Sequence, residues 1–248
     1  MPYKDGYSVL PRLMKLEDDP LFQKDENYDH FLAEKKKAVK HQQCFLEHDI
    51  TNEIYGRISS FIIEKADWVC PSTFDNLAMQ LQEDIAIHRI KDGRDWLAAC
   101  HICFPSGWRP EDKIGRPLDE IHIPIPGMNL NGGLKLAETM VNHGPFYRYV
   151  WSPVFDSFSK RRINYHPCQP TVEFDPRMPR LHLKVERQIT YGFPDIGAAL
   201  FVMRQDLLHP AKIDFPSLHH ALSEMTDEEK AYKGVTDDLL LWMKKTWW

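Results

Sequence analysis

Apolar residues recur at helical spacing through the first 90 residues. In three stretches they return every three or four positions, which is typical of amphipathic helices. The third stretch begins with Ser72-Thr-Phe-Asp75, which resembles a capping box with aspartate in place of glutamate or glutamine. The pattern therefore predicts helices over residues 24–48 and 52–65, and from Ser72 to about Arg89.

From Trp96 onward, apolar and polar residues alternate, which is the period of a half-buried strand. Residues 129–179 are rich in aromatics, prolines and charges and show no clear period. The predicted strands cover residues 96–104, 120–126, 181–191 and 198–203, and further helices are predicted over 217–225 and 237–245.

Helices followed by consecutive strands and then by helices are typical of an α+β fold with an antiparallel sheet. The length of 248 residues and the hydrophobic fraction of 43% allow one large domain with a sizeable core. We expect a single domain over residues 1–248, divided into a helical N-terminal part at about 24–90, a sheet-rich core at about 95–205 and C-terminal helices at 215–248.

The predicted strand over residues 120–126 has an unusual sequence, Ile-His-Ile-Pro-Ile-Pro at its centre. In an extended chain the three isoleucines fall on one face, and His122 falls on the other with the two prolines. Each proline fixes its own φ and pushes the preceding residue toward extended geometry. A single imidazole on a stiff backbone suits a metal or cofactor ligand. The alternative is an edge strand with a hydrogen-bonded histidine.

Arg187 interrupts an apolar row on the predicted strand over residues 181–191. A guanidinium cannot be neutralised by losing its proton, so its burial requires an anionic or polar partner. That partner is either a carboxylate of a cofactor or a substrate-derived group, or an aspartate or glutamate of the chain. Gln188 faces the opposite side of the same strand.

Charge and composition exclude several classes of partner. The formal net charge is −5, which argues against a nucleic-acid or anionic-membrane surface. No apolar stretch approaches the roughly 20 residues that span a bilayer, and the first residues lack a signal-peptide pattern. Five cysteines, an odd number, fit a reducing compartment. We therefore expect a cytoplasmic protein without nucleic-acid or membrane partners.

The Cys100-His101-Ile-Cys103 stretch lacks the partners that metal or haem motifs need. Phe104 stands where covalent haem attachment requires a histidine, and no second C-x-x-C pair exists for a zinc ribbon. Buried structural thiols are the favoured interpretation. Candidate second ligands to a metal are the histidines at positions 101, 143, 166 and 182. Because nucleotide-binding loops and cluster-binding cysteine sets are also missing, a redox enzyme of this sequence needs electrons from a separate reductase.

Several long motifs resemble one family. F-P-S-x-W-x-P-x-x-K-x-G over residues 104–115, followed by I-H-x-P-x-P-G over 121–127, is similar to the haem-dependent oxidative N-demethylase family, the haem subunit of secondary-amine monooxygenases. Gln82-Glu83-Asp84, expected in a helix, Arg148-x-x-Trp151 and Glu186-Arg187-Gln188 extend the resemblance. Together the similar motifs span about residues 28–234.

The resemblance implies a PAS-like domain that binds haem b non-covalently, with His122 as the proximal iron ligand. It implies oxidative demethylation of a small secondary amine such as dimethylamine, giving a primary amine and formaldehyde. The reaction uses O2 and electrons from a separate NAD(P)H-linked reductase. Val150 stands where the family pattern has an asparagine, which removes an amide able to form hydrogen bonds.

The same resemblance assigns roles to four further residues. Arg187 is the predicted catalytic residue, and Lys113, Trp108 and Gln188 are predicted to contact the cofactor. Trp108 otherwise caps the core, and Lys113 otherwise stays solvated, because both lie in a loop. Two alternatives to the enzyme stay open: a haem-binding sensor of PAS type without turnover, and a cofactor-free interaction domain.

Overall fold

The computed structural model describes residues 2–4, 6–8, 12–105, 108–128, 132–155 and 173–247. Ser106 and Gly107 of the first family motif lie outside the described residues. So does His166, one of the candidate second ligands.

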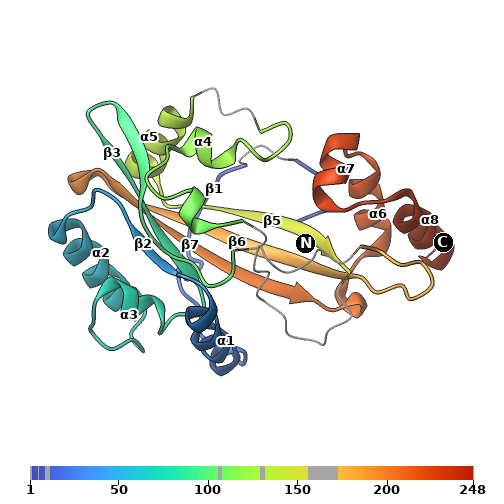
Figure 1. Ribbon diagram of the computed structural model, residues 1–248, viewed down its shortest axis with the longest axis horizontal. Coiled ribbons are helices and arrows are strands. Elements are labelled where there is room, and N and C mark those ends of the chain that lie inside the picture. Colours follow the sequence, from blue (N-terminus) through green and yellow to red (C-terminus); the bar gives the residue numbers. More distant parts are fainter. Residues whose placement is uncertain are drawn as a thin grey trace.

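One antiparallel sheet of seven strands organises the described chain (Figure 1). The strands are β1 (Met14–Lys15), β2 (Phe45–Glu47), β3 (Asp84–Lys91), β4 (Arg94–His101), β5 (Phe146–Val154), β6 (His182–Phe193) and β7 (Ala198–Leu208). They lie in the order β1-β5-β6-β7-β3-β4-β2, and every neighbouring pair is antiparallel. The predicted α+β class with an antiparallel sheet is confirmed, while the PAS-like label and the single haem-binding domain stay predictions.

Helices cover both faces of the sheet and one of its ends (Figure 1). They are α1 (Tyr28–His41), α2 (Asn52–Lys65), α3 (Phe74–Ala78), α4 (Leu118–His122), α5 (Gly133–His143), α6 (Phe215–Ser223), α7 (Asp227–Lys233) and α8 (Asp237–Trp247). Helices α2 and α3 lie on one face, α4 and α5 on the other, and α6–α8 gather at one end. No helix in the described ranges is long and apolar enough to cross a bilayer.

The largest core cluster lies between the sheet and α2. Ile58 and Ile62 of α2 are fully buried in the same cluster as Ile87 of β3 and Leu200 of β7, which are register partners. Each isoleucine removed from water stabilises the fold by about 1.5–3 kcal/mol. This burial explains why the helix predicted over residues 52–65 forms with the bounds that its apolar spacing indicates.

A buried charge network ties the start of β3 to the N-terminal part of the chain. Lys35 of α1 lies 3.5 Å from an Asp84 carboxylate oxygen, and both side chains are almost completely buried. Glu83 accepts a hydrogen bond from the Gln23 backbone N–H at 2.9 Å and lies 3.8 Å from the Arg204 guanidinium. Burial raises the pKa of Glu83 to about 7. The family's Gln-Glu-Asp motif therefore lies in a turn at the start of a strand, and its predicted helical position is wrong.

Two predicted helices are too long. The one over residues 24–48 ends at His41, and β2 begins at Phe45. The one from Ser72 ends at Ala78, and its cap is Thr73, whose hydroxyl accepts from the Asn76 N–H at 3.4 Å. The leucines and isoleucine of this stretch keep helical spacing by coincidence. Residues 84–89 instead form the start of a central strand that is buried on both faces, so polar positions do not mark its period.

The later elements agree better with the sequence pattern. Strands β4, β6 and β7 and helices α6 and α8 correspond to predicted elements, with ends that differ by a few residues. The sequence pattern does not predict strands β1, β2, β3 and β5 or helices α4, α5 and α7. Helix α7 starts with a full capping box, formed by Thr226 and Glu229.

Candidate functional site

A cavity lies between α4, α5 and the face of the sheet that they cover. Its empty space, counted with the solvent at its open side, is about 370 Å³. Its walls are Leu13, Leu118, His122, Met128, Leu136, Met140, Phe146, Arg148, Gln188, Thr190 and Phe201. Seven of these eleven side chains are apolar, so the four polar ones stand out as the groups that orient a bound molecule.

His122 is the last residue of α4, so the strand predicted over residues 120–126 is wrong. Asp119 and Glu120 occupy the first turn, where carboxylates interact favourably with the positive end of a helix. The helix stops before Pro124, which has no backbone N–H to continue the helical hydrogen bonds. Ile123 is 73% exposed, whereas the strand pattern placed it in the apolar row.

The helical position sets the protonation state of His122. Its Nδ1 lies 2.7 Å from the Leu118 carbonyl oxygen, and because a carbonyl only accepts, Nδ1 carries the proton. Burial, reinforced by the positive charges of Arg148 and Lys113, lowers the pKa of His122 to about 4. At neutral pH the ring is uncharged, and Nε2 keeps the lone pair that binds metals.

Arg148 and Gln188 form the polar wall beside His122. They are register partners on β5 and β6, and the Arg148 Nε–H donates to the Gln188 side-chain oxygen at 2.6 Å. The Gln188 amide in turn donates to the Glu186 carboxylate. Burial lowers the pKa of Arg148, and the negative charge of Glu186 opposes that effect. Since arginine stays protonated in proteins, this wall presents a fixed cation to the cavity.

Thr190 adds a buried hydroxyl without a partner. Its residue is 3% exposed, and its Oγ1 has no hydrogen-bond partner within the described chain. Buried hydroxyls are nearly always paired in folded proteins, because an unpaired one costs about 1–3 kcal/mol. The unpaired oxygen is therefore available for a hydrogen bond with a bound molecule. Thr190 lies two residues after Gln188 on β6, so the period of a strand places both side chains on one face.

Arg187 lies on the opposite face of the sheet from this cavity. It interrupts a buried apolar row as predicted, and it faces Arg204 of β7 across the ladder. Its guanidinium donates to the Pro20 carbonyl oxygen at 2.9 Å and lies 3.8 Å from the Asp19 carboxylate. These contacts favour the ion-pair interpretation of its burial. The predicted catalytic role of Arg187 stays a prediction without support from the cavity.

Lys113 and Trp108 lie beside α4 and do not line the cavity. The Lys113 ammonium donates to the Ile121 carbonyl oxygen at 2.5 Å, and burial lowers its pKa. Trp108 packs against the apolar cluster around Leu97 and Cys100. Lys113 therefore holds the end of the helix that carries His122, and the predicted cofactor contacts of both residues stay predictions.

None of the described candidate second histidines lines the cavity. His143 is exposed at the end of α5, and His182 opens β6. His101 is buried and lies beside Cys103, and both Cys100 and Cys103 are buried as predicted. Within the described ranges, the cavity therefore offers one imidazole, that of His122.

Taken together, the cavity can bind a metal through His122 Nε2 and an anionic group through Arg148, between apolar walls. A model of the family described as haem-dependent oxidative N-demethylase, alpha subunit-like, matches residues 44–238, more than three quarters of the chain. The matched part includes β3–β7 and both helices that cover the cavity. The chain therefore belongs to the haem-dependent oxidative N-demethylase alpha subunit-like family.

Proposed function

We propose that this chain binds haem b without covalent attachment and oxidatively demethylates a small secondary amine such as dimethylamine. His122 is the proposed iron ligand. The observation that carries the proposal is the neutral imidazole of His122, with its Nδ1 proton engaged and its Nε2 lone pair unprotonated in an apolar cavity. Membership of the family supports haem dependence and oxidative demethylation.

The donor set of the cavity fits a haem group. A haem needs an axial nitrogen, apolar walls for the ring and cations for its two propionates. His122 would supply the nitrogen, α5 and β7 supply apolar side chains, and Arg148 supplies a cation for one propionate. The unpaired Thr190 hydroxyl offers one further hydrogen bond. The haem ring is larger than this cavity, so the match is one of donor chemistry and not of size.

The residues of the chain would position the reactants. Leu118 holds the His122 ring through Nδ1, Lys113 fixes the end of α4, and Gln188 orients the guanidinium of Arg148. The apolar walls exclude water from the bound amine. Bound haem supplies the activation of O2 and the oxidation of the carbon next to nitrogen. The balanced reaction consumes the secondary amine, O2, two electrons and two protons, and yields the primary amine, formaldehyde and water.

The proposed electron source is a separate NAD(P)H-linked reductase, and the proposed location is the cytoplasm. The sequence lacks flavin, nicotinamide and iron–sulfur cluster motifs, which supports a separate reductase as the electron source. The proposed cytoplasmic location is supported by four cysteines of the described chain that form no disulfide, because free thiols fit a reducing compartment. They stand at positions 44, 70, 100 and 103.

The test is an absorption spectrum of the full-length protein reconstituted with haem, compared with His122→Ala and His143→Ala. We expect one haem per chain in the wild type and in His143→Ala, and at least a tenfold weaker affinity in His122→Ala. A His122→Gly variant should regain the wild-type spectrum when imidazole is added. Equal affinity and an unchanged axial-ligand spectrum in His122→Ala would refute the assignment. Formaldehyde production from dimethylamine, reductase and O2 tests the reaction itself.

A second candidate function is a haem-binding sensor. Val150 favours it, because this residue faces Glu186 across the β5–β6 ladder and replaces the asparagine of the family pattern. A sensor would bind haem through His122 yet release no formaldehyde, and Val150→Asn would then be the variant in which to look for turnover. A protein that binds no haem at all would instead be an interaction domain.

A further inference from the structure

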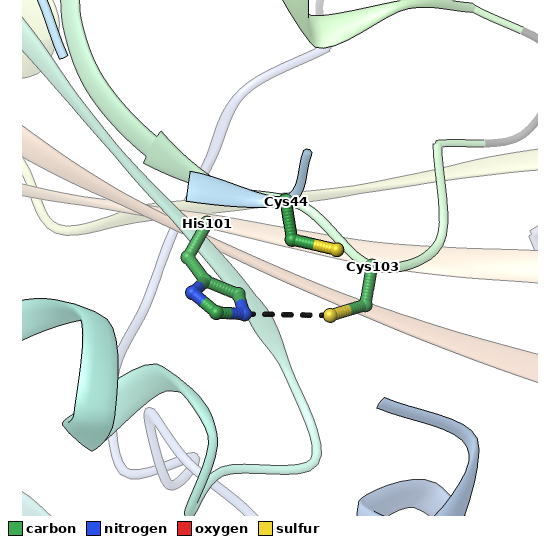
Figure 2. A group of neighbouring side chains, drawn as sticks. All are labelled: Cys44, His101 and Cys103. Atoms are coloured by element: carbon green, nitrogen blue, oxygen red, sulfur yellow. Dashed lines mark hydrogen bonds between the residues drawn. The ribbon is translucent and has the colours of Figure 1, made fainter. Parts of the chain in front are cut away.

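Three potential metal ligands from separate parts of the chain converge at one edge of the sheet. Cys44 directly precedes β2, His101 ends β4, and Cys103 follows two residues later. Their ligand atoms all lie within 4.8 Å of one another, and the three residues are at most 3% exposed. Figure 2 shows the two sulfurs and the ring directed toward a common space. Two thiols and an imidazole are the donors that zinc prefers.

One donor pair already has the spacing of a zinc site. In Figure 2 the dashed line joins His101 Nε2 to Cys103 Sγ, which are 3.4 Å apart. Sulfur about 2.3 Å and nitrogen about 2.0–2.1 Å from a tetrahedral zinc ion lie about 3.5 Å from each other. The imidazole and the thiol therefore need almost no movement to share one ion.

A carboxylate already orients the imidazole for metal binding. The Asp75 side chain, from α3, lies 2.7 Å from His101 Nδ1, so that this nitrogen holds the proton. The Nε2 lone pair consequently faces Cys103. Carboxylate, histidine and metal in this order form the arrangement that fixes the tautomer of zinc-bound histidines.

The Gln42 side-chain amide lies beside both cysteines. Its nitrogen lies 3.6 Å from the Cys44 sulfur. The same amide donates to the Cys103 carbonyl at 3.1 Å and so holds the two cysteine backbones together. The nearest buried charges, Lys35 and Asp84, already pair with each other. Two thiolates would then neutralise a divalent ion without leaving a net charge in the core.

We propose that Cys44, His101 and Cys103 bind one Zn²⁺ ion, which fastens the edge strand β2 to the end of β4. Among the described residues the site has three protein ligands. The site is separate from the proposed haem cavity. His101 shares its face with Ile85, its ladder partner in the α2–α3 core, whereas the cavity lies on the opposite face of the sheet.

Cys100 provides a matched control for the test. It is a fully buried thiol on β4, next to His101 in sequence, but it packs against the apolar cluster on the opposite face. Full-length protein, reduced and stripped of metal, is titrated with Zn²⁺ against a chromogenic chelator. We expect one Zn²⁺ per wild-type chain and per Cys100→Ser chain, and at least a 100-fold loss of affinity in Cys44→Ser and Cys103→Ser.

Asp75→Asn tests the same site without removing a ligand, and its half-exposed side chain makes the variant safe for folding. The expected loss of zinc affinity is about 10–100-fold. With Co²⁺ as the probe, thiolate-to-metal charge-transfer bands should form in the wild type and Cys100→Ser but not in Cys44→Ser. The proposal is overturned if the wild type binds no stoichiometric Zn²⁺, or if Cys100→Ser loses it equally. A Cys44–Cys103 disulfide in metal-free purified protein, seen as a mass loss of two hydrogens, also overturns it.

Discussion

Gly192 of β6 is the position where one added methyl group should disturb the proposed haem cavity most directly. A Cβ built there would lie 2.0 Å from the Val141 carbonyl oxygen and 2.6 Å from the Met140 carbonyl oxygen. Both are backbone atoms at the end of α5, so no side-chain rotation relieves the contact. Ordinary contacts begin at about 3.4 Å, so α5 must move by more than 1 Å. Helix α5 carries Leu136 and Met140, which form one wall of the cavity.

The expected cost follows from two opposing effects. Overpacking of a close contact costs about 1–3 kcal/mol, and rigid carbonyls place Gly192→Ala at the upper end. Alanine also makes the unfolded chain less flexible, which stabilises the folded state by about 0.4–1 kcal/mol. This gain applies because φ at Gly192 is not positive, so alanine can adopt the same backbone conformation. The net loss of unfolding free energy is therefore about 2 kcal/mol. For a chain of this length the melting temperature should fall by about 4–8 °C.

Urea unfolding of the metal-free, haem-free protein measures this difference directly. Gly56→Ala is the matched control, because Gly56 is exposed inside α2 and a Cβ there meets no atom within 4 Å. That variant should gain about 0.5–1 kcal/mol. If Gly192→Ala unfolds at the same urea concentration as the wild type or at a higher one, the close packing of α5 on β6 is not what the structure indicates.

Three further substitutions test the buried charges and a helix cap. Lys35→Met should cost about 3–5 kcal/mol in urea unfolding, because it leaves the buried Asp84 carboxylate unpaired. Glu83 has a pKa of about 7 in the folded chain, whereas its ordinary value is 4.5. Between these pH values the folded chain therefore binds one proton more than the unfolded chain. Stability should therefore fall by about 3 kcal/mol as pH rises through this window, and Glu83→Gln should flatten the profile. Thr226→Ala should cost about 1 kcal/mol, seen as faster amide exchange in α7.

Local patterns were sufficient where one face of an element is buried and the other is solvated. Helix α2 follows its apolar spacing from Asn52 to Lys65, because its stripe packs on the sheet and its other side faces water. Strand β6 alternates in the same way, and this alternation correctly placed Arg187 and Gln188 on opposite faces. What the pattern did not show is which of these faces carries the cavity.

The spacing of apolar residues gave wrong predictions where tertiary packing overrides the local preference of the chain. The isoleucines of residues 121–125 alternate like a strand, yet the chain forms α4 and leaves Ile123 exposed. The acidic first turn at Asp119 and Glu120 was a helix signal competing with that alternation. The sequence pattern predicts a helix where β3 forms. Both faces of β3 are buried, so it lacks the alternating polar positions that would indicate a strand.

Motifs in the sequence indicated the family, and with it the expectation of haem chemistry centred on His122, because each motif is a run of neighbouring residues that needs no tertiary structure to be recognised. Tertiary structure decided which side chains share a site. The β5–β6 register sets Arg148 beside Gln188, with Thr190 next on the same face, and the β2–β4 pairing brings Cys44 to His101 and Cys103. The physical reason is that ladder register depends on turns, packing and buried charges distributed over the whole chain, so residues forty or more positions apart become neighbours that no local period encodes.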